Sequence, residues 1–500
     1  MATYKINDPD PIYNNLAPLW KKSRAVCGGE RKVKAYDKTL DVQKFTNLLV
    51  PFSPYMDQGQ YDFYKAEAEL PGITSQFAKM LVGGLLRKPP SLTLPEDIPS
   101  GAMEWILKEF GEDDSTLVAF MNDVLWEEIQ TSRAWVHVAY PRISKDERDS
   151  LTAAELLEYK PYPVVWPAES VINVKTGISR TGKSELKLVV VSGYKEVFTT
   201  NEFHPDIIET MTVHALDEDG FYYVDIYERP VSPGMPSGAG DFEKKESITD
   251  ITSHDVRLNF IPAWPLSGAI GGQEPILSAI IDKEISLYNK ISRRNHLLYG
   301  AATYTPIVFS DMGDAEFREI VNKGLGTWLK LGRDDKADIL KTPTEALKDM
   351  ETAIAAGIEE IAKLGVRMLS PEAQQSGIAI EIRNAAQTAQ LGSLSSKVSS
   401  VMGQIITFMI NWRYGLELKN TDVEFTLSDD FNPVPLGADW LRLATEWYEA
   451  GLIPRSIWLL LLKQNDMIPN DYDDKQGQLE INGSEMIPSR NDASRLKGPP

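Results

Sequence analysis

The sequence is poor in cysteine and histidine, and its apolar runs are short. The single cysteine, Cys27, excludes an internal disulfide framework and a cysteine-built zinc site. The five histidines are scattered without a metal-binding spacing. The longest apolar runs, such as WLLLL at 458–462, are too short to cross a bilayer, and the first residues lack a signal-peptide pattern. We therefore expect a protein that works in, or is released from, a cytosol, without a membrane span, metal or other cofactor.

Basic residues are also scarce, with 52 Lys and Arg against 72 Asp and Glu and a net charge of −20. A protein that grips DNA tightly neutralises phosphates with a basic stripe, and no such stripe is present. No G-x-S-x-G nucleophile motif occurs, and no two carboxylates pair by spacing. The sequence therefore predicts a protein that is not an enzyme, and its 500 residues predict two or three packed regions.

The first half of the chain changes from helical to β-rich. Residues 1–132 hold helical apolar periodicity, as in 11–29, 72–90 and 113–132. Residues 133–267 are β-branched, aromatic and partly alternating, and DEDG at 217–220 lies where a hairpin turn is expected. The Gly- and Pro-rich stretch 232–247 is predicted to be an exposed loop within this β region.

Long helices dominate the second half, so the fold class is expected to be α+β and mainly helical. Helices are predicted over 276–301, 344–369 and 378–414, with a compact α/β insert at 302–343. The second helix has an apolar side that comprises Leu347, Met350, Ile354, Ile358, Ile361 and Met368. The third helix has a heptad seam, and its uncharged start at 384–396 favours a packed interface or channel wall, whereas 398–412 also fits a buried core helix.

One complete motif points to a different function. GISRTGKS, from Gly177 to Ser184, matches the phosphate-binding P-loop pattern G-x-x-x-x-G-K-[ST]. A working P-loop needs a helix that starts at the Lys-Ser pair, so that the helix N-terminus faces the phosphates. The residues that follow, Leu186 to Val191, have strand chemistry instead. We therefore predict a hairpin tip with Lys183 exposed, and keep a P-loop NTPase as the alternative function.

The order of elements resembles that of the tailed-bacteriophage portal proteins. In that family a stem helix leads to a clip, a second stem helix returns, and a tunnel loop joins it to a long wing helix. The stretch 161–196 resembles the wing strands, with Val174 where a tryptophan is common. The stretch 439–469 resembles a helical sequence near portal C-termini, with Pro454 in place of the usual serine. The resemblance covers about residues 10–470.

The resemblance implies a division of the chain into the regions of a portal subunit. These are a wing at 1–275 (helical over 1–132, β-rich over 133–267), stem helices at 276–301 and 344–369, a clip at 302–343, a tunnel loop at 370–380, a wing helix and strand at 381–437, crown-like helices at 438–470 and a mobile tail at 471–500.

The resemblance also implies the function and the partners. Portals form rings, usually of twelve copies, at one capsid vertex of the virion, after assembly in the host cytoplasm. DNA passes through the ring, a terminase motor and later a head–tail adaptor dock on it, and the capsid or scaffold surrounds it. A non-portal virion structural or scaffold protein is the further alternative.

On this basis the sequence predicts three groups of functional residues. The second stem helix is expected to supply acidic surface, partly toward the channel, through Glu345, Asp349, Glu351, Glu359 and Glu360. The first stem helix carries Arg293 and Arg294, which are expected to pair with a neighbouring subunit or, as the less favoured alternative, to touch DNA. The tunnel loop would present Gln374, Gln375 and Ser376, whose uncharged donors can hold phosphates weakly.

Overall fold

The structure is a computed structural model of the 500-residue chain. It describes residues 5–428 apart from gaps, of which the longest are 142–149, 199–204, 231–239, 310–335 (two positions excepted) and 370–376, together with isolated positions between 442 and 462. The chain divides into two compact units, Met1–Asp429 and Asp430–Pro500. Each unit is described by itself.

The N-terminal part of the first unit is helical, as the sequence predicts. The side chains of Asp10 and Thr116 accept hydrogen bonds from the first turns of two of its helices, which explains where those helices begin. Gly28 and Gly29 follow the first helix and end it. The helices are α1 (Pro11–Cys27), α2 (Glu30–Tyr36), α3 (Gln58–Glu67), α4 (Ile73–Leu85), α5 (Ala102–Lys108) and α6 (Leu117–Thr131).

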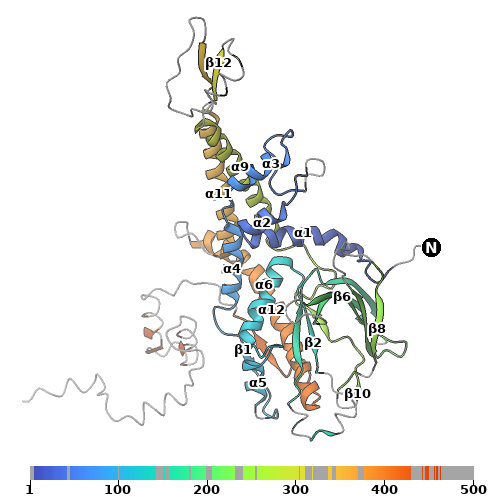
Figure 1. The fold of residues 1–500 in the computed structure, drawn as a ribbon. Coiled ribbons are helices and arrows are strands. Elements are labelled where there is room, and N and C mark those ends of the chain that lie inside the picture. Colours follow the sequence, from blue (N-terminus) through green and yellow to red (C-terminus); the bar gives the residue numbers. More distant parts are fainter. Residues whose placement is uncertain are drawn as a thin grey trace, which may run out of the picture. The chain divides into compact units, whose positions relative to one another are not determined.

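An antiparallel five-stranded sheet, in the order β4-β5-β6-β7-β8, fills most of the predicted β region (Figure 1). Its core comprises Ile172, Val190, Met211, Val213 and Ala215. The strands are β4 (Val171–Ile178), β5 (Ser184–Val197), β6 (Asp206–Leu216), β7 (Tyr222–Pro230) and β8 (Glu243–Ile248).

The turn predicted at 217–220 is confirmed, and the loop predicted at 232–247 is partly wrong. Between β6 and β7, Asp217 N–H donates to the carbonyl of Phe221, and Gly220 adopts a φ of +88° that favours glycine. Residues 243–247, however, belong to β8, an edge strand paired with β7. Its charged side chains hide the strand from sequence patterning, and it is held in the sheet by backbone pairing and by contacts of Lys244 and Ser247 with Asp225 of β7.

Smaller sheets connect distant parts of the first unit. A three-stranded sheet has the order β11-β2-β3, with β2 (Trp135–Ala139) between β11 (Ala263–Pro265) and β3 (Tyr162–Trp166). The strand predicted within 421–469 is β14 (Glu424–Thr426), and it pairs with β1 (Ser91–Thr93). The remaining short strands are β9 (Thr252–Ser253) and β10 (Val256–Arg257), which pair with each other.

The three long helices are close to their predicted ranges. They are α9 (Ser278–Ala302), α11 (Glu345–Leu369) and α12 (Gly377–Tyr414). Strands β12 (Thr305–Phe309) and β13 (Lys336–Leu340) form an antiparallel pair between the end of α9 and the start of α11. Figure 1 shows α9 and α11 side by side, and the two helices are in contact. The α+β class is therefore confirmed.

The C-terminal half of α12 is a core helix. Val398, Met402 and Ile405 are fully buried, and the ring of Phe408 lies 5.6 Å from that of Trp264, a residue of β11. Thr407 bonds back to the carbonyl of Gly403 within the helix. The heptad seam over 398–412 therefore marks burial in the subunit. The side chains of 381–390 lie outside the described residues, so the uncharged start of the helix stays a prediction.

The second unit contributes isolated described positions. The rings of Tyr448 and Trp458 stack with centroids 4.8 Å apart, and the indole of Trp458 donates to Thr445 at 3.3 Å. The crown-like helices predicted over 438–470 fall mostly outside the described residues, and the tail 471–500 falls outside them entirely.

Candidate functional site: the α9–α11 helix pair

A carboxylate of α9 caps the N-terminus of another helix. Glu284 is fully buried, and its two oxygens accept from the backbone N–H groups of Ile73 (2.9 Å) and Thr74 (2.7 Å). These groups open α4, whose own N-cap, Gly72, has no side chain to accept them. A negative charge at a helix N-terminus is favourable, because it meets free N–H donors and the positive end of the helix dipole. Glu284 therefore fixes α9 against α4.

Two further polar residues of α9 contact the N-terminal part of the chain. The amide of Asn289 accepts from the N–H of Val50 and donates to the carbonyl of Leu48, both at 2.8 Å. Asp282 forms an ion pair with Lys22 of α1 at 2.5 Å. Because the Glu284 and Asn289 contacts are to backbone, the position of α9 depends on the path of the chain at 48–50 and 72–74.

Helix α11 packs on α9 through small and apolar residues, and ion pairs bridge the two helices. A Cβ placed on Gly357 would lie 3.3 Å from a methyl of Leu287, so glycine allows close approach here. Lys283 contacts Glu360 at 2.6 Å, and this ion pair lowers the pKa of Glu360. Arg294 contacts Glu351 at 2.7 Å.

The apolar side predicted for α11 is partly altered by this packing. Ile361 is buried, and Leu347, Met350 and Ile354 are half-buried, in agreement with the 3,4 spacing. Ile358 is 43 % exposed instead. Its neighbour Gly357 takes the position against α9, which leaves the isoleucine outside the contact.

The predicted acidic residues of α11 lie on its outer surface where their side chains are described. Asp349, Glu351, Glu359 and Glu360 are exposed, and two of them pair with cations of α9 in the same chain. The side chain of Glu345 lies outside the described residues, although its backbone begins α11. Whether any of these carboxylates faces a channel stays a prediction.

The two predicted arginines differ in their surroundings. Arg293 is exposed near the hydroxyl of Tyr64, whereas Arg294 is half-buried and takes Glu351 as its partner within the chain. This intrachain pair was not expected from the sequence, because the two residues are 57 positions apart. An intersubunit role for either arginine stays a prediction. Gln374, Gln375 and Ser376 lie outside the described residues.

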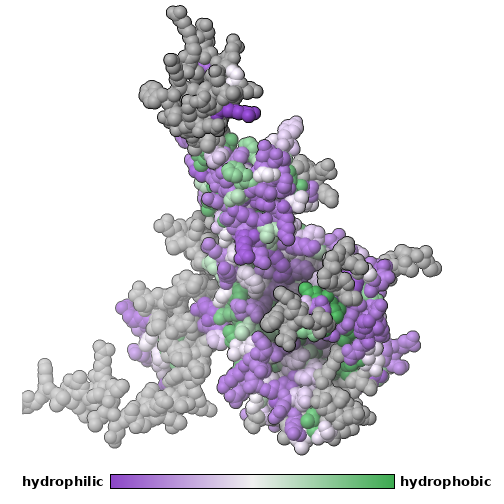
Figure 2. Space-filling view, viewed as in Figure 1, coloured by the Kyte–Doolittle hydropathy of each residue, from purple (hydrophilic) through white to green (hydrophobic). Residues whose placement is uncertain are grey.

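Aromatic side chains gather where α3 meets the second half of α9. The ring of His296 lies 4.7 Å from Phe52 and 5.2 Å from Tyr64, and Phe63 contacts Tyr299 at 5.4 Å. Phe52, Phe63 and Tyr299 are all more than a third exposed. Figure 2 shows apolar residues among hydrophilic ones over this part of the molecule.

The P-loop match forms a hairpin tip. Gly177 lies in β4, which ends at Ile178, and Ser184 begins β5, where it pairs with Ile178 in an antiparallel register. The N–H of Ser179 donates to the carbonyl of Lys183 at 2.8 Å, and Gly182 has a φ of +78°. Since a strand follows the Lys-Ser pair, no helix N-terminus faces the turn. The predicted hairpin with an exposed Lys183 is confirmed.

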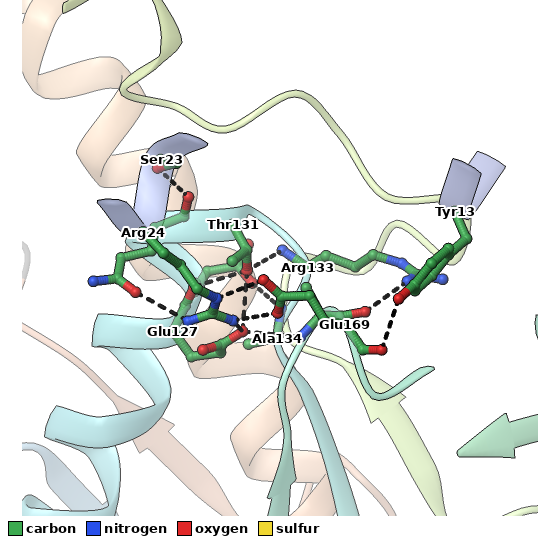
Figure 3. Close-up of polar contacts among 11 residues, drawn as sticks. Tyr13, Ser23, Arg24, Glu127, Thr131, Arg133, Ala134 and Glu169 are labelled. Atoms are coloured by element: carbon green, nitrogen blue, oxygen red, sulfur yellow. Dashed lines mark hydrogen bonds and ion pairs between the residues drawn. The ribbon is translucent and has the colours of Figure 1, made fainter. Parts of the chain in front are cut away.

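A partly buried ion network was missed by the sequence reasoning. Arg24 of α1 donates to Glu169, which precedes β4, and to Glu127 of α6, each at 2.6 Å (Figure 3). Arg133 donates to the carbonyls of Ala168 and Val171 beside it. The network joins helices to the β region. No spacing signal could reveal it, because Arg24 lies more than 100 residues along the chain from both of its carboxylate partners.

Two histidines in strands, His137 of β2 and His214 of β6, contact aromatic side chains. His214 shares a 2.7 Å hydrogen bond with the hydroxyl of Tyr222, and His137 stacks on Trp166 at 4.6 Å. Burial lowers the pKa of His137 to about 3 and holds that of His214 well below its usual value. Within the described part of the chain, no group of three or more His, Cys, Asp or Glu is placed to hold a metal ion. Nor does any helix there have the length and apolar content of a membrane span.

Comparisons with known proteins give two kinds of likeness. Residues 276–413 match a family described as a domain of unknown function (DUF4055), and this segment spans α9 to α12. Two solved structures are each 10 % identical in sequence to this chain, and each match covers 78 % of this chain and 89 % of the other chain. They come from the neck of an empty GTA particle computed with C6 symmetry, at a TM-score of 0.38, and of a native GTA particle computed with C12 symmetry, at 0.35. A search of curated proteins gave no match.

Proposed function

We propose that the chain is a portal protein of a tailed phage, which forms a ring at one capsid vertex. DNA is packaged and ejected through this ring, a terminase motor docks on it first, and a head–tail adaptor replaces the motor. The chain itself carries out no catalysis in this proposal. It works as part of the virion, in contact with the capsid or scaffold, after assembly in the host cytoplasm.

One observation carries the proposal. Helices α9 and α11 pack side by side, the β12–β13 pair closes their ends, and α12 follows with 38 residues whose second half enters the core. This is the order of stem, clip, stem and wing helix that the resemblance implies. The contacts of Glu284 and Asn289 support a stem helix with a fixed position, because they hold α9 to the helical part of the proposed wing.

The charge of the protein is compatible with DNA that passes without binding. The chain has a net charge of −20, so a ring of many copies is strongly acidic. An acidic lining repels phosphates, and DNA would therefore not be held at many sites. The exposed carboxylates of α11 are the candidates for such a lining.

The proposal is tested by electron microscopy of the purified full-length chain in negative stain, with the mass measured by light scattering. We expect rings with a central hole. Monomers under every condition tried would overturn the proposal, and closed shells or fibres would indicate the scaffold or other virion alternative instead.

The P-loop alternative is tested separately by ATP hydrolysis. We expect no turnover above a buffer control, since Lys183 lies at a hairpin tip between two strands. Turnover that Lys183→Ala abolishes would establish an NTPase. Lys175→Ala, at an exposed lysine of β4, is the matched control.

A further inference from the structure

Helix α9 exposes a stripe of cations. Its exposed side chains in the range 279–293 recur about once per turn, at 279, 282, 283, 286, 290 and 293. From 283 onward, every charged member of this stripe is basic, namely Lys283, Lys290 and Arg293. Of the two acids in this part of the helix, Glu284 is buried, and Asp282, an exposed member of the stripe, is paired with Lys22. The stripe is therefore a positively charged surface along one side of α9.

Helix α11 exposes a surface of the opposite character. Where the side chains of α11 are described, four exposed acids stand against one exposed lysine, and three alanines are exposed as well. The acids are Asp349, Glu351, Glu359 and Glu360, the lysine is Lys348, and the alanines are Ala353, Ala355 and Ala356. The small alanine side chains leave room for a second helix to approach closely.

Ion pairs within the chain involve only some of these charged side chains of α9 and α11. Lys283 is paired with Glu360, and Glu351 is paired with Arg294. Among the described residues, Lys290, Arg293 and Asp349 form no ion pair within 4 Å, and Lys290 acts on Glu360 only as a nearby charge that helps lower the pKa of that carboxyl. Charge on α9 and on α11 is thus left over on the same subunit, on two surfaces that adjoin where Lys283 contacts Glu360.

We propose that the cationic stripe of α9 in one copy docks against the exposed face of α11 in the next copy. The inference rests on the proposed ring, because a ring is built from head-to-tail contacts between two different patches of one subunit. Lys290 and Arg293 meet the acidic face that includes Asp349. Complementary charge favours this pairing over α9 against α9 or α11 against α11, which would bring like charges together.

Charge reversal on each surface tests the contact in the full-length protein. Lys290→Glu/Arg293→Glu reverses the stripe, and Asp349→Lys/Glu359→Lys reverses the acidic face. Each variant alone is expected to raise the concentration needed for ring assembly about tenfold or more, measured by mass and by counting rings in negative stain. The two sets combined restore opposite charges and are expected to recover assembly.

The matched control is Lys175→Glu/Lys183→Glu, which changes the net charge by the same amount as the stripe variant, but on the β4–β5 hairpin. It is expected to form rings like the unaltered protein. Circular dichroism melts establish that all variants fold, which is expected since every altered side chain is exposed.

The outcomes separate this inference from the proposed function. If the unaltered protein forms no rings, the portal proposal fails. If it forms rings and the stripe variant assembles as well as the control, the contact is wrong while the portal proposal stands, and a role of these cations toward DNA gains support. Loss of rings in both reversed variants without recovery in the combined one also refutes the pairing of α9 with α11.

Discussion

The carboxylate of Glu284 offers the sharpest test of how α9 is held in place. Replacement by alanine removes the acceptor of two backbone N–H groups at the start of α4, at 2.9 and 2.7 Å, in a site with no solvent exposure. A hydrogen bond to a charged group contributes about 1.5–3 kcal/mol, and an unsatisfied buried donor costs about 1–3 kcal/mol. We therefore expect Glu284→Ala to destabilise the contact between α9 and α4 by about 3–6 kcal/mol.

Hydrogen exchange of the amides over 73–77, read by mass spectrometry, measures this loss locally. Exchange is suited to the question because a chain with two compact units need not unfold in one step. A loss of 3 kcal/mol corresponds to about a hundredfold faster exchange through local opening. Glu284→Gln keeps the volume and one acceptor oxygen, so it is expected to fall between the unaltered protein and the alanine variant.

The control for this prediction is Ser286→Ala on the exposed side of the same helix. An exposed substitution of this kind changes the free energy of unfolding by less than about 0.5 kcal/mol. If the amides over 73–77 exchange no faster in Glu284→Ala than in Ser286→Ala, the carboxylate does not hold α4 against α9, and the prediction is wrong.

Three further predictions concern residues of α1 and of the five-stranded sheet. Arg24→Met leaves two partly buried carboxylates without their shared cation and is expected to cost about 2–4 kcal/mol in urea unfolding; an unchanged midpoint would contradict the network's role. Burial lowers the folded-state pKa of His214, so the free energy of unfolding is expected to fall as the pH drops below about 6.5. The fall is at most about 1.4 kcal/mol per pH unit for this residue. In His214→Gln, the melting temperature should depend less on pH between about pH 6.5 and 5. Gly182→Ala forces a φ of +78° on a residue with a side chain and is expected to cost about 1 kcal/mol, against no measurable change for Lys183→Ala.

Much of the fold follows from local pattern. The ends of α9, α11 and α12 lie within two residues of their predicted positions, because long apolar periodicity leaves few alternatives. The hairpin at the P-loop match was also predictable, since alternation after the Lys-Ser pair excludes a helix. Strand β8 was missed, because its charged side chains give no apolar signal and its pairing partner determines its structure.

The candidate site was less predictable than the fold. The sequence indicates which residues of α11 are acidic, but only the helix contact shows that Glu351 and Glu360 have cationic partners on α9. The capping of α4 by Glu284 joins positions about 210 residues apart, and no spacing rule spans such a distance. Ile358 illustrates the same limit, since the small side chain of Gly357, and not the apolar period, decides which residue faces α9.

The distribution of charge on the helix pair alters the argument about a DNA channel. Helix α9 contains four cations and two acids, whereas α11 contains five acids and three cations, so the pair is neutral overall and the net charge of −20 lies elsewhere. The total charge of a ring therefore says nothing about its lining at the stem, which depends on which helix faces inward. With α11 inward the wall is acidic and repels phosphates, and with α9 inward it is basic and retards DNA. Docking of the α9 stripe on the next copy removes those cations from the channel, so the same contact that closes the ring would leave α11 to determine the charge that DNA meets.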